Sequence, residues 1–217
     1  MSRVRVHNFS ISLDGYGAGP RQSPEAPLGE GAERLHEWIF ETRSGRAMIG
    51  REGGESGLND EMFHARTDGI GATIMGRHMF GPVRGPWADE SWRGWWGEEP
   101  PFGHDVFVLT HHPRAPLAML GGTTFHFVDA SPQEALELAK SAADGADVIV
   151  GGGASTIRQF LAAGLIDEMH MVITPVLLLG GESLFYPVLP GLADYECAGL
   201  ACSGGVTHAR LTRKEGG

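Results

Sequence analysis

Three consecutive glycines (Gly151–Gly153) follow a short apolar strand at 147–150 and precede a helical pattern at 154–164. Because glycine has no side chain, the backbone can approach a ligand closely there. The first turn of a helix presents unpaired N–H groups and a partial positive charge, which together suit a phosphate. Ser155 and Thr156 add two hydroxyl groups to that turn. The block indicates a phosphate-binding turn; a tight glycine-rich turn without a ligand is the alternative.

Polar side chains also follow two other apolar strands. The first strand ends at Arg77, whose planar guanidinium can form two parallel hydrogen bonds to a phosphate. The second ends in Thr110, His111 and His112. Since the carboxyl ends of parallel strands share one edge of a sheet, these groups predict a dinucleotide site together with the glycines. Exposed loop histidines are the alternative for His111 and His112.

Several known motifs are absent from the sequence. There is no Walker lysine and no G-x-G-x-x-G, so neither a P-loop NTPase nor a Rossmann domain is indicated. The ten histidines include no H-E-x-x-H, and their spacing predicts no metal site.

The composition excludes further classes of protein. The 217 residues carry a net charge of -10 with no Lys/Arg cluster, which argues against a nucleic-acid or anionic-membrane partner. Residues 1–15 contain no apolar core of a signal peptide, and no apolar run approaches the roughly 20 residues of a membrane span. Cys197 and Cys202 would lie roughly 16 Å apart on a strand, too far for a disulfide. We expect a reduced, cytoplasmic protein.

The apolar periodicity predicts an α/β fold. Strands are expected at 4–13, 72–75, 105–110, 124–128, 147–150 and 167–179, with a hairpin at 194–213. Helices are expected at 31–43, 60–68, 132–143 and 154–164, with Asn59 and Ser131 as N-caps. Strands that alternate with helices predict a mostly parallel sheet with helices on both faces, and consecutive late strands predict an antiparallel edge. We expect a single domain over residues 1–217.

The segment 82–103 contains four of the five tryptophans, Trp87, Trp92, Trp95 and Trp96, among glycines, prolines and acids. This composition predicts a long ordered loop. It either closes over a planar ligand or packs against the sheet as cover.

With these residues identified, the chain resembles the dihydrofolate reductase-like superfamily, and within it the reductase domain of riboflavin-biosynthesis deaminase-reductases. The resemblance extends over essentially the whole chain. It rests on Ser-Leu-Asp-Gly at 12–15, Gly-Arg at 76–77, Val-Leu-Thr at 108–110, and the blocks 148–161 and 166–185. It implies a three-layer fold with NADPH across the carboxyl edge of the sheet. The segment 94–102 is similar to a bacterial subgroup of stand-alone members.

The resemblance assigns cofactor contacts to three strand ends. The residues it implies are Gly76, Arg77, His78, Met79, Thr110, His111, Gly151, Gly152, Gly153, Ala154, Ser155 and Thr156. Many members have an arginine directly after the residue that matches Thr110, where this chain has His111. Histidine is a weaker partner for a 2′-phosphate than arginine, so NADH is possible in place of NADPH.

The resemblance also implies hydride transfer from nicotinamide to a pteridine- or pyrimidine-like substrate. Asp14 is the predicted catalytic and substrate-orienting carboxylate; a turn-forming Asp-Gly is the alternative. Trp38 is a predicted substrate contact, with core packing as the favoured alternative, whereas Glu37, His36 and His7 are expected on polar faces. No deaminase motif is present. A homodimer is expected, and the alternative function is a non-catalytic nucleotide- or flavin-binding protein of the same fold.

Overall fold

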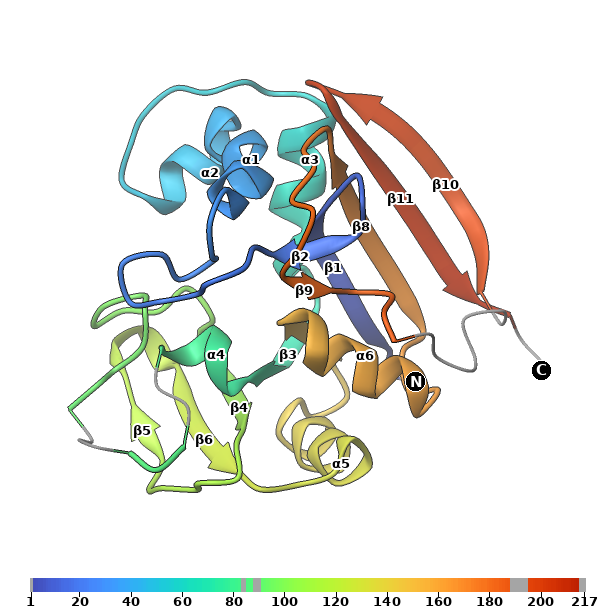
Figure 1. Ribbon diagram of the computed structural model, residues 1–217. Coiled ribbons are helices and arrows are strands. Elements are labelled where there is room, and N and C mark those ends of the chain that lie inside the picture. The colour runs from blue at the N-terminus through green and yellow to red at the C-terminus, as the bar shows by residue number, and fades with distance from the viewer. Residues whose placement is uncertain (1, 83–84, 88–90, 188–194, 215–217) are drawn as a thin grey trace.

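In the computed structural model, which describes residues 2–82, 85–87, 91–187 and 195–214, nine strands form one sheet across the molecule (Figure 1). In sheet order they are β10 (Tyr195–Ser203), β11 (Val206–Arg213), β8 (Glu168–Thr174), β1 (Val4–Ser12), β7 (Asp147–Gly152), β3 (Ile70–Gly76), β4 (Asp105–Leu109), β6 (Thr124–Val128) and β5 (Leu117–Ala118). Pairing is parallel from β8 to β6 and antiparallel at both edges. The predicted fold class is confirmed.

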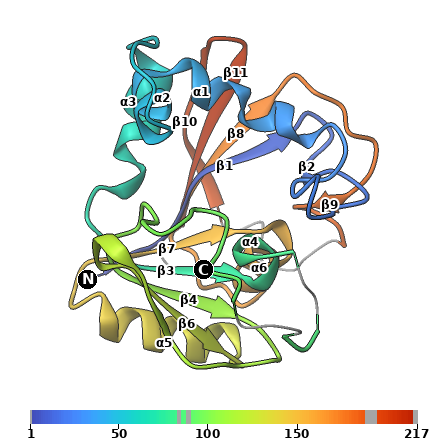
Figure 2. The same cartoon turned by 90° about the vertical axis from the view of Figure 1, so that its left-hand side faces the viewer.

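Helices cover both faces of the sheet (Figures 1 and 2). The α5 (Pro132–Ala142) and α6 (Ala154–Ala162) helices cover one face, and α1 (Glu37–Glu41), α2 (Arg43–Met48) and α3 (Leu58–His64) cover part of the other. Successive side chains of β8 point to opposite faces of the sheet, so this strand contributes to the hydrophobic cores on both faces. Met169 and Met171 join the core beneath α6, whereas Val172 packs with Trp38 and Phe63 beneath α1 and α3.

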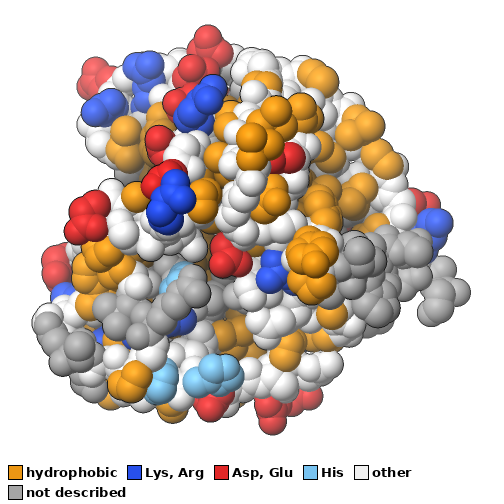
Figure 3. Space-filling view, viewed as in Figure 1, with side chains coloured by type: hydrophobic (Ala, Val, Ile, Leu, Met, Phe, Trp, Pro, Cys, Tyr) orange, Lys and Arg blue, Asp and Glu red, His pale blue; other side chains and the backbone are white. Residues whose placement is uncertain are grey.

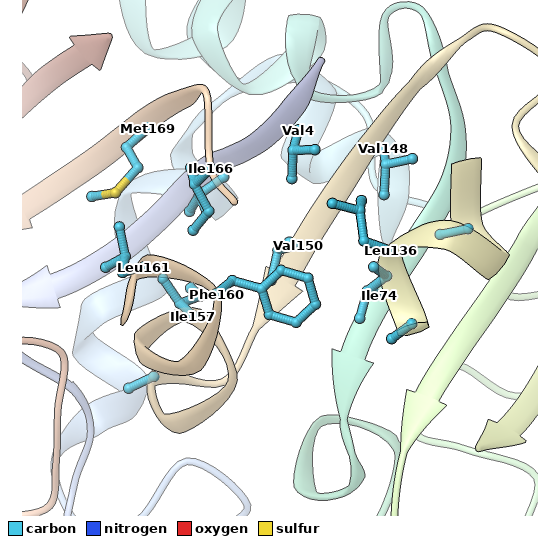
Figure 4. Close-up of a cluster of buried hydrophobic side chains, with 14 of the residues drawn as sticks. Val4, Ile74, Leu136, Val148, Val150, Ile157, Phe160, Leu161, Ile166 and Met169 are labelled. Atoms are coloured by element: carbon cyan, nitrogen blue, oxygen red, sulfur yellow. The ribbon is translucent and has the colours of Figure 1, made fainter. Parts of the chain in front are cut away.

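The main core lies between α6 and the middle strands (Figure 4). Ile157, Phe160 and Leu161 recur at the spacing of one helix face, so all three point at the sheet and are buried. Each such side chain contributes about 1.5–3 kcal/mol through burial. This packing holds the amino end of α6 in place at the carboxyl end of β7.

Two predicted helix starts have different outcomes. Ser131 caps α5, and its hydroxyl and the Glu134 carboxylate form a capping box, as expected. Asn59 is not a cap, and that prediction is wrong. Gly57 is the N-cap of α3 instead, and the side-chain amide oxygen of Asn59, Oδ1, lies 2.9 Å from His208 Nε2.

The other differences concern short or interrupted elements. The predicted strand 167–179 ends at Thr174, because the next residue is Pro175, which has no N–H for the ladder. The helix expected at 31–43 is a 3₁₀ turn, η1 (Ala32–His36), followed by α1. The sequence did not predict α2, β5, β2 (Tyr16–Ala18) or β9 (Glu182–Ser183), and the last two pair as a small separate ribbon. The remaining short turns are α4 (Arg77–Phe80), η2 (Ala65–Thr67) and η3 (Leu120–Gly122).

The tryptophan-rich segment packs on the part of the same sheet face that α1–α3 leave uncovered. Trp87, Trp92 and Trp96 are partly buried against a cluster that includes Phe80, Phe125 and Val108. Trp92 Nε1 donates to the Phe80 carbonyl at 3.0 Å. The described part of this segment therefore forms the cover that was one of its two expected roles.

Five of the exposed large hydrophobic side chains lie in two neighbouring segments: Leu13, Leu177, Leu179, Phe185 and Tyr186. Figure 3 shows hydrophobic side chains over the half of the face where β8, β9 and the segment between them lie. Cys197 and Cys202 are free and exposed. Among the described residues no helix has the length and apolarity to cross a membrane.

Candidate functional site

A cavity of about 780 Å³ opens at the carboxyl edge of the sheet and extends over the face below α1–α3. Figure 2 shows α4 and α6 near each other at the ends of β3 and β7. All the predicted cofactor residues line this cavity: Gly76, Arg77, His78, Met79, Thr110, His111, Gly151, Gly152, Gly153, Ala154, Ser155 and Thr156. We call the part lined by these residues and by His112 and Asp129 the edge region. The part lined by His7, His36, Phe63, Arg66, Thr73 and His104 is the face region.

The glycines of the edge region have two different functions. Gly76 allows close packing, because a Cβ there would lie 2.4 Å from Thr156 Oγ1. Gly152 has φ +131° and lies against the Phe9 ring, so it also meets a steric requirement of the fold. Gly153 is exposed at the N-cap of α6, and a Cβ there would meet no atom within 4 Å. Of these three glycines, Gly153 is the one with no atom within 4 Å of a Cβ position, so it borders open space directly beside the helix amides.

Arg77 does not present its whole guanidinium to the cavity. Its Cζ lies 3.1 Å from the Trp87 ring centroid, and its Nη1 donates to Thr110 Oγ1 at 3.1 Å. Nε and Nη2 are buried and have no hydrogen-bond partner among the described residues. Burial, with a smaller effect of Arg114, lowers the pKa of Arg77 to about 10, so it stays charged at neutral pH. A phosphate could reach the buried nitrogens only if Trp87 moved.

The face region carries three histidines that are neutral at pH 7. Burial, with smaller contributions from Arg5 and Arg210, lowers the pKa of His7 to about 4. Burial likewise lowers the pKa values of His36 and His104. His104 Nε2 lies 2.7 Å from Thr73 Oγ1. The region thus offers imidazoles as hydrogen-bonding groups rather than as charges.

His7 is the first member of a buried histidine row. Its ring centroid lies 4.7 Å from that of His170, whose Nε2 is 2.9 Å from His208 Nδ1. Because the Asn59 carbonyl can only accept, His208 donates through Nε2 and must accept at Nδ1 from His170. Burial, with His7 and His208 next, lowers the pKa of His170 to about 3. Burial therefore keeps the row neutral, and the hydrogen bonds hold His170 and His208 each in one tautomer.

Two predicted site residues lie outside the residues that line the cavity. Asp14 accepts from the backbone N–H groups of Leu178 and Leu179 at 3.1 and 2.8 Å. Trp38 is buried, and its Nε1 donates to Ser10 Oγ at 3.0 Å. Ser10 lines the cavity, so Trp38 contacts a residue of the site but not the cavity itself. This geometry favours the structural alternatives, and the roles proposed for Asp14 and Trp38 stay predictions.

The sequence analysis did not select several residues of the face region. His7 and His36 were expected on polar faces, yet both line the cavity, whereas Glu37 is exposed as expected. Thr73, His104 and Ser10 were not predicted to be site residues. The available signal was a polar residue inside an apolar strand, as at His7 and Thr73. That signal marks a face of the sheet but does not say which face carries a cavity.

A comparison with known families decides where the chain belongs. The sequence model of the RibD C-terminal domain matches residues 4–193. The chain belongs to this family. No curated protein matches the chain.

Solved structures of the family have the same fold. A Shewanella sp. PV-4 protein named for riboflavin biosynthesis is 20% identical with a TM-score of 0.62, covering 99% of this chain and 100% of that one. The Thermotoga maritima diaminohydroxyphosphoribosylaminopyrimidine deaminase/5-amino-6-(5-phosphoribosylamino)uracil reductase is 15% identical with a TM-score of 0.59. The alignment covers 98% of this chain and 56% of the Thermotoga chain. These likenesses show a shared fold, and membership of the RibD C-terminal domain family supports a reductase-type protein.

Proposed function

We propose that this chain is an NAD(P)H-dependent reductase that acts on a pteridine- or pyrimidine-like heterocycle. The observation that carries the proposal is the glycine turn before α6, which borders open space inside a cavity of about 780 Å³. A volume of this size is typical of small-molecule sites. Membership of the RibD C-terminal domain family supports the same reaction class. A homodimer and a cytoplasmic location remain parts of this proposal.

The residues present fit a nicotinamide dinucleotide. The first amides of α6 and the hydroxyl of Ser155 would hold its pyrophosphate beside Gly153. When bound, the nicotinamide supplies the hydride. Hydride transfer asks the protein mainly to orient two rings and to exclude water.

The face region would receive the heterocycle. Phe63, Phe102 and Trp96 give it flat apolar walls, and His7, Ser10 and Thr73 give it hydrogen-bonding groups. Neutral imidazoles can polarise a C=O or C=N group of a substrate without carrying a charge themselves. Within this proposal, Asp14 would act on the loop that contains Leu178 and Leu179, not on the substrate.

The test has a binding step and a turnover step. We expect tryptophan fluorescence to report micromolar binding of NADPH or NADH, because Trp87 and Trp96 adjoin the cavity. Oxidation of the bound nucleotide is then followed with dihydropterins and with ribosylated aminopyrimidines. Turnover with either class supports the reductase. Tight binding without turnover favours the non-catalytic nucleotide-binding alternative, and no binding at millimolar nucleotide refutes both.

A further inference from the structure

The outer end of the edge region is formed by the ends of β4 and β6. Thr110 and His111 follow β4, and Asp129 follows β6, the neighbouring parallel strand. His111 Nδ1 and Asp129 Oδ1 lie 2.9 Å apart. The side chain of Asp129 is 55% exposed and that of His111 is 92% exposed, so both are accessible to a ligand.

The cavity leaves one place for each arm of a dinucleotide, if the proposed function is correct. The pyrophosphate belongs beside Gly153, in the middle of the edge region. The nicotinamide arm must turn into the face region, because hydride transfer requires ring contact with the substrate away from water. The adenosine arm then runs along the edge, past Arg77 and Thr110, to His111 and Asp129.

The charges at this end oppose a 2′-phosphate. Of the residues that the structure describes, the two arginines near this end have other contacts: Arg77 stacks on Trp87, and Arg114 Nη2 donates to the Trp92 carbonyl at 2.9 Å. Arg114 also lies 4.0 Å from the Trp87 ring centroid and is not among the described residues that line the cavity. Among the described residues, the Asp129 carboxylate is therefore the charged group exposed at this end of the cavity.

We propose that Asp129, oriented by His111, selects a ribose with a free 2′-hydroxyl, so that this chain binds NADH in preference to NADPH. A 2′-hydroxyl can donate to the carboxylate, as acidic residues do in NAD-specific sites of other folds. A 2′-phosphate would place its negative charge next to that carboxylate, whereas the guanidinium groups of Arg77 and Arg114 are held against Trp87 and Trp92. Asp129 and His111 are then specificity-determining residues.

The experiment compares dissociation constants for NADH and NADPH at low salt, followed by tryptophan fluorescence. We expect the wild-type protein to bind NADH about tenfold more tightly than NADPH, the size of effect that one like-charge contact near a surface produces. Asp129→Asn removes the charge at constant shape and should shift the ratio about tenfold toward NADPH. Glu137→Gln, an exposed charge change on α5, is the matched control and should leave the ratio unchanged.

The pair 5′-AMP and 2′,5′-ADP repeats the comparison without the nicotinamide arm. Weaker binding of 2′,5′-ADP, relieved by Asp129→Asn, supports the proposal. NADPH binding at least tenfold tighter than NADH in the wild type overturns it, as does an unchanged ratio in Asp129→Asn. Failure of both dinucleotides to bind is a different result, which removes the proposed function itself.

Discussion

The edge and face regions of the cavity are built from different parts of the chain. In the edge region the usable groups are backbone amides at the start of α6, bordered by Gly153, which has open space around it. In the face region they are side chains, chiefly His7, His36 and His104, which come from β1, from the 3₁₀ turn η1 and from the residue before β4. One region therefore depends on the absence of side chains and the other on their identity.

This difference determines how each region responds to change. A backbone site keeps its donors whatever residues follow, but an added charge beside it blocks the ligand. A side-chain site tolerates changes nearby but depends on the protonation state and tautomer of each imidazole. Substitutions can therefore test the backbone site of the edge region and the side-chain site of the face region separately.

The largest effect is expected from Gly153→Asp. Its backbone has φ -74° and ψ -170°, which any residue can adopt, and aspartate is a favoured N-cap. The added carboxylate would lie where the pyrophosphate is proposed to bind. We expect nucleotide affinity to fall about 100-fold, since like charges at close range cost a few kcal/mol. The thermal midpoint should stay the same or rise.

Gly153→Asn is the matched control, because it has the same size and capping ability without the charge. It should weaken nucleotide binding far less than Gly153→Asp. Equal losses in both variants would mean that space, not charge, matters here. Unchanged binding in Gly153→Asp would place the pyrophosphate elsewhere.

The histidine row predicts a pH-dependent stability. The pKa values of His7 and His170, about 4 and about 3, lie below the ordinary value of 6.5. Below pH 6.5 the unfolded chain therefore binds more protons than the folded chain, and the free energy of unfolding falls as the pH falls. Above pH 6.5 this loss is absent. One such histidine costs about 2 kcal/mol between pH 7 and pH 5, measurable by urea unfolding.

His170→Gln sharpens this test, because glutamine does not titrate. Its unfolding free energy should depend less steeply on pH than that of the wild type. An identical slope would show that other groups cause the pH dependence. The variant should keep its nucleotide affinity, since His170 is buried and is not among the residues that line the cavity.

The sequence was a good guide to the edge region because its parts are local. Gly151–Thr156 are consecutive, and Arg77 and Thr110 each directly follow an apolar strand. A parallel sheet brings such positions to one edge by its geometry alone. What the sequence could not give is the direction of each side chain: Arg77 faces Trp87, and Trp87 belongs to a segment with no periodic pattern.

The histidine row that begins at His7 in the face region was missed because its contacts are distant in sequence. His208 and Asn59 are separated by 149 residues and meet only because β11 pairs with β8 beside α3. Asn59 just before a helical pattern reads as a cap, and tertiary contact with a buried imidazole overrides that local preference. Strand alternation placed His7 on a face but could not reveal the cavity above it.

The smallest effect is expected from Asp14→Asn, which tests whether this carboxylate belongs to either region. Burial tends to raise the pKa of Asp14, but hydrogen bonds from Ser12 and from the amides of Leu179 and Leu178 outweigh it and lower the pKa. Asparagine keeps one acceptor oxygen, so we expect the free energy of unfolding to fall by about 1 kcal/mol or less. Nucleotide affinity and turnover should match those of the Glu137→Gln control. A large loss of turnover at unchanged affinity would instead restore Asp14 as a catalytic residue, and the loop at Leu178 and Leu179 would then have to bring it to the substrate.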